Sequence, residues 1–153
     1  MRHRIVGALV LAAGLLLCAV PRAATADPSQ PTIVLPDQVH WTPGTGPMAG
    51  VEVAVLVGDP TKAGPYTIRL RMPNGAKFAP HFHDDTERVT VISGTIMVGI
   101  GNTMVESTMT ALPAGSFVSI PAKVPHSALA KGITVIQIGG NGPMTMTAVA
   151  QGK

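Results

Sequence analysis

The sequence predicts an all-β protein whose short antiparallel strands form a barrel or a sandwich. Apolar and polar residues alternate over short stretches, as in residues 66–72, where Ile68, Leu70 and Met72 share one face. The 17 Gly and 14 Pro residues recur between these stretches, which is typical of strands joined by tight turns. After residue 26 no stretch carries a convincing helical period. The remaining length suits a single domain with one core.

The alternation places the expected strands along the whole of this domain. They are predicted at residues 51–57, 66–72, 78–83, 87–92, 95–100, 116–120, 126–130, 133–138 and 144–149. A further short strand is expected at 32–35, and residues 103–112 are predicted to be a loop or a weak strand. Gly94 is expected to end the strand at 87–92 in a turn, because glycine tolerates positive φ.

The first 26 residues have the pattern of a secretory signal peptide. A basic start at 2–4 precedes an apolar run at 5–20, and the small residues at 24–26 form an A-x-A site, so cleavage is expected after Ala26. The apolar run is shorter than the roughly 20 residues that span a bilayer. An uncleaved anchor and a lipid on Cys18 are weaker alternatives. The protein is therefore expected to be exported, to the periplasm or outside the cell, with no membrane attachment after cleavage.

Removal of the leader changes the charge of the chain. Three of the eleven Lys and Arg residues lie before the cleavage site, and all eight Asp and Glu residues lie after it. The mature chain is therefore neutral, without the basic surface that nucleic acid requires. The only cysteine also lies in the leader, which excludes disulfides and thiol chemistry from the mature protein.

Four residues stand out as metal ligands: His81, His83, Glu87 and His126. Side chains two positions apart in a strand point the same way, so His81 and His83 share a face. A turn at 84–86 and the strand that follows would bring Glu87 back beside them, in one short hairpin. Imidazole nitrogens and a carboxylate suit mid-sized divalent metals.

These residues belong to two spaced motifs that resemble the motifs of the cupin superfamily. In the first, Gly75, His81, His83, Glu87 and Gly94 are separated by five, one, three and six residues, and in the second Gly115, Pro121 and His126 are separated by five and four. The resemblance implies a cupin jelly roll, also called a double-stranded β-helix, that binds one metal through His81, His83, Glu87 and His126. Lys123 and Ala130 depart from the second motif at positions where the family usually has Gly and often Asn.

The resemblance divides the chain into a signal peptide at 1–26, a Pro-rich amino-terminal arm at 27–47 and a single cupin domain at 48–150. Cupins commonly pair through sheet edges or through this arm, so the arm, which contains Trp41, predicts a homodimer. Lys123 is expected to strain its turn if its backbone is left-handed.

The expected function is that of a metal-dependent enzyme acting on a small organic molecule. A dioxygenase-type oxidoreductase and an isomerase or lyase are both consistent with such a site. The alternative is a non-catalytic module that binds a small ligand through the metal, or a metal buffer. The ligand set does not choose among Mn, Fe, Zn, Ni, Co and Cu. No catalytic residue is predicted apart from the ligands.

Several other residues invite a chemical role, and each has a simpler interpretation. Arg69 and Arg71 share a face that would clamp a carboxylate if it pointed inward, but a solvated face is expected. Asp84 and Asp85 could act as an acid or a base, but they are interpreted as turn-capping residues. Lys123 could lie at the barrel mouth, but it is interpreted as a solvated turn residue.

The remaining candidates are expected to pack. His40 beside Trp41 has no ligand spacing, and Ser127 should face away from His126 on its strand. Thioethers would suit copper(I), but the scattered methionines are expected to fill the core. These are Met97, Met104, Met109, Met144 and Met146.

Overall fold

The structure is a computed structural model that describes residues 30–150, and the predicted signal peptide lies outside these residues. Residues 32–150 belong to one compact unit, and only residues 30–31 of the unit that precedes it are described. Across 30–150, no helix has the length and apolar character needed to cross a membrane.

Short strands dominate the described chain, with three single-turn 3₁₀ helices between them. In order, the elements are η1 (Pro36–Gln38), β1 (Thr42–Pro43), η2 (Gly46–Met48), β2 (Glu52–Val57), β3 (Gly64–Met72), β4 (Lys77–Phe82), β5 (Glu87–Ile100), η3 (Glu106–Thr108), β6 (Thr110–Pro113), β7 (Phe117–Ile120), β8 (His126–Gly142) and β9 (Thr147–Ala148).

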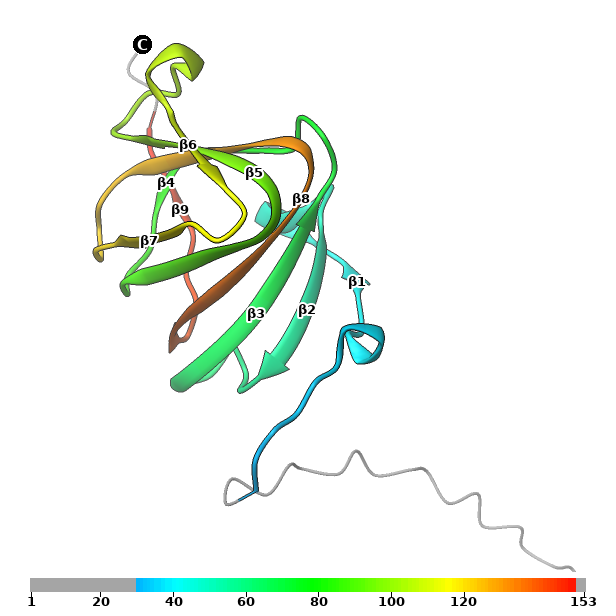
Figure 1. The fold of residues 1–153 in the computed structure, drawn as a ribbon. Coiled ribbons are helices and arrows are strands. Elements are labelled where there is room, and N and C mark those ends of the chain that lie inside the picture. Colours follow the sequence, from blue (N-terminus) through cyan, green and yellow to red (C-terminus); the bar gives the residue numbers. More distant parts are fainter. Residues whose placement is uncertain (1–29, 151–153) are drawn as a thin grey trace, which may run out of the picture. The chain divides into compact units, whose positions relative to one another are not determined.

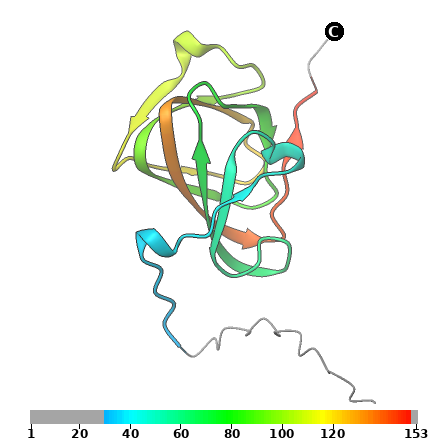
Figure 2. The same cartoon turned by 90° about the vertical axis from the view of Figure 1, so that its right-hand side faces the viewer.

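The strands close into the predicted antiparallel jelly-roll barrel (Figures 1 and 2). One path of neighbours runs β1-β2-β3-β8-β4-β9, and β5 joins it by pairing with β8. The free side of β5 pairs with β7 in its first half and with β6 in its second half. The long strand β8 is therefore the element that links the two sides of the barrel.

The core is the inward-facing set of alternate residues that the sequence predicts. On β3, Ile68, Leu70 and Met72 are at most 1% exposed, whereas the residues between them are partly exposed. They pack against Val91 and Ile136 from the neighbouring long strands. Burial of such aliphatic side chains contributes roughly 1.5–3 kcal/mol each, which accounts for a stable barrel with few aromatic residues.

The prediction that Gly94 ends a strand is wrong. β5 continues from Glu87 to Ile100, with shifts of register on both sides of Ser93 that mark a β-bulge. Gly94 has a φ of +75°, which bends the strand without ending its pairing. The separately predicted strands at 126–130 and 133–138 are likewise one strand, β8, with Gly132 at a φ of +74°.

The predicted hairpin between residues 78–83 and 87–92 is also wrong. β4 pairs with β8 and β9, and β5 pairs with β6, β7 and β8. The connection at 83–86 therefore crosses from one part of the barrel to another.

One predicted strand, at 32–35, is absent, and another, at 144–149, is shorter than expected. Residues 32–35 form no strand, because the backbone N–H of Leu35 is bound by the Gln38 side chain at the start of η1. Within 144–149 only Thr147 and Ala148 lie in a strand, because Met144 instead donates its backbone N–H to the Pro60 carbonyl at 2.6 Å. The weak strand at 103–112 is η3 followed by β6.

The described part of the arm is fixed to the barrel at β1, which pairs with β2. The Arg71 guanidinium lies 4.6 Å from the centre of the Trp41 ring, a cation–π contact. The same guanidinium donates to Glu52 at 2.6 Å. Nearer the amino terminus Ile33 and Leu35 are exposed, at 76% and 51%.

Candidate metal centre

The three predicted histidine ligands meet inside the barrel. His81 on β4 and His126 at the start of β8 are direct register partners, and His83 follows the last residue of β4. Their side chains are 5%, 3% and 8% exposed in that order. One ring nitrogen from each lies within 4.8 Å of the others. These three residues could therefore hold a metal ion.

Hydrogen bonds to the backbone determine which nitrogen each ring offers. Nδ1 of His81 lies 2.7 Å from the Ala79 carbonyl, and Nδ1 of His126 lies 3.0 Å from the Val124 carbonyl. Nδ1 of His83 contacts the Thr145 carbonyl. A carbonyl only accepts hydrogen bonds, so each Nδ1 carries the proton and donates it. In the neutral rings Nε2 is left with its lone pair free for a metal.

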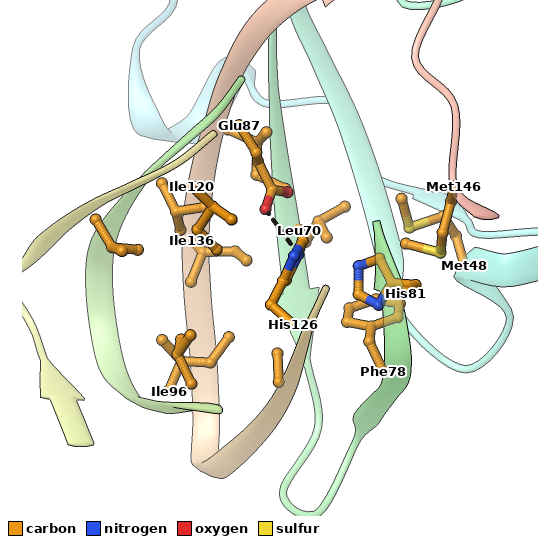
Figure 3. A pocket seen from close by; sticks show the side chains of 15 residues that line it. Met48, Leu70, Phe78, His81, Glu87, Ile96, Ile120, His126, Ile136 and Met146 are labelled. Atoms are coloured by element: carbon orange, nitrogen blue, oxygen red, sulfur yellow. Dashed lines mark ion pairs between the residues drawn. The ribbon is translucent and has the colours of Figure 1, made fainter. Parts of the chain in front are cut away.

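Glu87, the first residue of β5, brings a carboxylate to these nitrogens. Its Oε2 is 3.3 Å from Nε2 of His126 (Figure 3). Its Oε1 is 3.6 Å from Nε2 of His83. Because the neighbouring Arg88 pairs with Gly139 near the far end of β8, Glu87 reaches His126 across the interior. Neutral imidazole Nε2 and carboxylate oxygen are both acceptors, so this approach needs a proton or a cation between them.

Without a metal, two opposing effects set the pKa values of His126 and Glu87: burial disfavours the charged form of each group, and the attraction between them favours it. Burial lowers the pKa of His81 to about 4, more than its hydrogen bond to Ala79 raises it, so the ring is neutral at pH 7. Burial would lower the pKa of His126, but the Glu87 carboxylate raises it above its usual value. Burial would likewise raise the pKa of Glu87, but the imidazoles, His126 first, hold it below its usual value.

The chemistry of this donor set fits a mid-sized divalent cation. Three imidazole nitrogens and one carboxylate are borderline ligands of the kind that Zn, Fe, Mn and similar ions accept. Nε2 of His83 is buried and has no hydrogen-bond partner among residues 30–150. A buried acceptor without a partner costs about 1–3 kcal/mol, and coordination of a cation would satisfy it.

A cavity of about 30 Å³ adjoins His81, Glu87 and His126 (Figure 3). That volume holds roughly two water molecules. The other twelve residues that line it are hydrocarbon or thioether side chains. Two of them are Met48 from η2 and Met146 from the segment before β9, both labelled in Figure 3.

Sequence comparison agrees with this geometry. A family model described as the ChrR cupin-like domain matches residues 29–145. The chain belongs to this cupin family. No curated protein matches the sequence.

Solved structures share the fold of this cupin at low identity. The polyketide cyclase RemF from Streptomyces resistomycificus matches with a TM-score of 0.63 and 14% identity, over 81% of this chain and 89% of that chain. An RmlC-like cupin from Shewanella frigidimarina matches at 0.57 and 16%, over 73% and 91%. A salicylate 1,2-dioxygenase from Pseudaminobacter salicylatoxidans matches at 0.53 and 21%, over 67% and 31%. At these identities the likeness establishes the fold alone.

The charged candidates near the motifs do not enter the cavity of this cupin. Arg69 donates through Nε to Gln137 at 3.1 Å, and Arg71 binds Glu52, so no carboxylate clamp forms inside the barrel. The carboxylate of Asp85 accepts the Asn141 backbone N–H at 2.6 Å, a capping role. Lys123 and Asp84 pair with each other at the surface.

The other candidates also lie away from the cavity, with one exception. His40 is exposed, so the expectation that it packs is wrong. The buried hydroxyl of Ser127 has no hydrogen-bond partner in the described chain. Among the five methionines singled out from the sequence, only Met146 lines the cavity. Sequence reasoning missed the roles of Met48 and of the Thr145 carbonyl, since neither carries a motif.

Proposed function

We propose that this cupin binds one divalent metal ion through His81, His83, Glu87 and His126. The observation that carries the proposal is that Nε2 of His83, which has no hydrogen-bond partner among the described residues, and Nε2 of His126 both face the Glu87 carboxylate inside the barrel. A cation at this point would satisfy all of these acceptors together. Four protein ligands leave one or two positions of a mid-sized ion open, as in catalytic metal sites.

We further propose that the protein is a metal-dependent enzyme of the dioxygenase type that acts on a small organic molecule. The metal would supply binding and polarisation of oxygen-containing groups. The residues of the chain would hold the ligands, exclude bulk water and bind the body of the substrate. Since the cavity lining offers no acid or base apart from the proposed ligands, an isomerase or lyase that needs a separate proton-transfer residue is supported less.

A second candidate is a module that captures a small ligand on the metal without turnover. The same absence of a separate acid or base in the lining favours it. The two candidates differ in what happens to a bound molecule. Oxygen consumption and product formation by the metal-loaded protein would support the enzyme, whereas stoichiometric binding with unchanged recovery of the molecule would support the binding module.

The first experiment is elemental mass spectrometry of the mature protein purified from its own host. His81→Ala and His126→Ala are measured beside it, and His40→Ala, which changes an exposed histidine, is the control. We expect about one equivalent of metal in the unchanged protein and in His40→Ala, and its loss in the other two. Iron or manganese would favour oxygen chemistry, and zinc would favour plain ligand binding. An unchanged protein without metal, even after reconstitution, would contradict the proposal.

We also propose that residues 1–26 direct export. The family match begins at residue 29, just beyond the predicted cleavage site, which supports a boundary there. Mass spectrometry of the protein from its host should find an amino terminus at Asp27, in the periplasm or the medium. An intact leader on cytoplasmic protein would contradict export.

A homodimer formed through the arm is proposed as well. The exposed apolar side chains of Ile33 and Leu35, together with Val55 and Val57 on β2, support it, because a partner would cover them. Light scattering of the protein without residues 27–47 should show a smaller mass than the complete mature chain. An unchanged mass would count against the arm as the interface.

A further inference from the structure

A groove at the surface of the barrel adjoins the inner cavity, and some of the same side chains line both of them. The outer groove, of about 220 Å³, is lined by Pro47, Lys77, Ala148 and other residues at the β4–β9 edge. Phe78, His81 and Met146 line both hollows. These three side chains are therefore what separates the groove from the cavity at His81.

Two methionines lie in or beside the wall between the groove and the cavity. Met146 lies in it, and Met48, the last residue of η2, lines the inner cavity directly after Pro47, which lines the groove. Methionine is unbranched and has three rotatable side-chain bonds, so it changes rotamer readily. The free volume of about 30 Å³ is too small for an organic ligand, and displacement of these two thioethers would enlarge it toward the groove.

Apart from His81, Glu87 and His126, the cavity lining has no charged or polar side chain that could pair with a charge on a ligand. The twelve lining residues other than His81, Glu87 and His126 are all apolar. Arg69 and Arg71 are bound to partners outside the cavity, and Lys77 lines only the outer groove. A charged group buried without a partner or a metal costs several kcal/mol, so a ligand can bring its charge to the metal but not to the rest of the cavity.

We propose that the ligand of this site is a small molecule with one metal-coordinating group and an otherwise uncharged, apolar body, and that it reaches the metal from the groove past Met48 and Met146. The inference rests on the proposed metal site and adds the chemical class of its ligand. Molecules that carry a second ionised group away from the metal are excluded by the lining.

The test compares two hydroxamic acids that differ only at the end of their chain. Butanohydroxamic acid ends in a methyl group, and succinic monohydroxamic acid ends in a carboxylate at the same position. Calorimetry with the zinc-loaded mature protein should show at least about tenfold tighter binding of the butano compound. Equal or tighter binding of the succinic compound, or no binding of either, would overturn the proposal. Zinc content measured in the same samples separates this result from a failure of the metal site itself.

Variants identify where the chain of the probe lies. Met146→Ala should speed association of butanohydroxamic acid several-fold in stopped-flow measurements, whereas Met144→Ala, which is partly buried but does not line the cavity, should leave the rate unchanged. Lys77→Met should leave the ratio of the two affinities unchanged. If Lys77→Met weakened only the succinic compound, the chain of the ligand would lie in the groove, and the proposal would be wrong.

Discussion

The backbone carbonyl of Thr145 accepts the hydrogen bond from Nδ1 of His83, from a position 62 residues further along the chain. The Thr145 hydroxyl also accepts the backbone N–H of Asp84 at 2.9 Å. One residue of the segment before β9 thus orients His83, a proposed metal ligand, and holds Asp84, the residue that follows it. Outer contacts of this kind set the ring orientation and the tautomer of a histidine ligand.

Thr145→Val should therefore weaken metal binding although the carbonyl itself remains. The change removes the hydroxyl that holds Asp84 while the shape of the side chain is kept. We expect a loss of about 1 kcal/mol in stability and roughly tenfold in metal affinity. Competition with a chromophoric zinc chelator measures the affinity. Thr147→Val, at an exposed position of β9, is the control, and equal affinities for the two variants would contradict the role of Thr145.

The predicted strain at Lys123 is present, because its φ is +64°. Its backbone N–H donates to the His83 carbonyl at 2.8 Å, which holds the left-handed turn in place. A left-handed residue other than glycine costs about 1–2 kcal/mol. Lys123→Gly and Lys123→Ala both remove the ion pair with Asp84, but only glycine relieves the backbone. Urea unfolding should show the glycine variant more stable by about 1 kcal/mol, and a less stable glycine variant would contradict it.

A comparison of Gly94 with Gly132 distinguishes the cost of backbone strain from the cost of crowding. Their φ values are nearly the same, +75° and +74°, but their surroundings differ. A Cβ at Gly94 would lie 2.4 Å from the Ile133 carbonyl oxygen, whereas a Cβ at Gly132 would meet nothing within 4 Å. Gly132→Ala should cost about 1–2 kcal/mol in free energy of unfolding. Gly94→Ala should cost at least about 2 kcal/mol more, or prevent folding. Thermal unfolding of the two variants provides the comparison, and similar costs would show that the bulge tolerates a side chain.

Tyr66 reports on the charge inside the barrel. Burial, followed by the negative charges of Glu87 and Asp85, raises its pKa to about 12. An unfolded tyrosine ionises near 10. Between these values the folded state binds more protons than the unfolded state, so stability falls as pH rises through this range. Because Tyr66 is the only tyrosine, the absorbance of tyrosinate gives its titration directly.

Glu87→Gln tests the cause of the Tyr66 shift. In the metal-free protein, removal of the carboxylate charge should lower the pKa of Tyr66, and unfolding in urea should return it to about 10. Asp85→Asn should lower it by less, since Asp85 is the smaller of the two charge effects. A midpoint near 10 in the folded protein would show that the ring is not buried in solution.

The strand positions and the meeting of the three histidines could be predicted because both depend on local spacing. Alternation identified β2, β3, β4 and β7 to within a few residues. His81 and His83 share a face because they are two residues apart, and the motif spacing pointed to His126. That inference does not need the correct pairing of the strands, which is why it succeeded although the expected hairpin between β4 and β5 does not exist.

What failed depends on contacts between distant parts of the chain. Gly94 and Gly132 have the signature of a turn, but the backbone of neighbouring strands keeps each of them within a continuous strand. The Thr145 carbonyl has no sequence signal, because every residue has a carbonyl and only the path of the chain selects this one. Met48 and Met146 meet at the cavity for the same reason, from elements far apart in sequence.

The proposed metal centre needs residues from late in the chain, His126 on β8 and Thr145, so it forms late in folding. Ribosomes release a chain from its amino terminus, and His81 emerges well before His126 and Thr145. β3 must also wait for its partner, since Gly64 pairs with Gly142. Pairings this distant form slowly. The proposed metal centre would therefore be complete only when nearly the whole chain is available. Acquisition of an ion would then belong to the compartment where folding finishes, and the metals supplied there would decide which ion is bound.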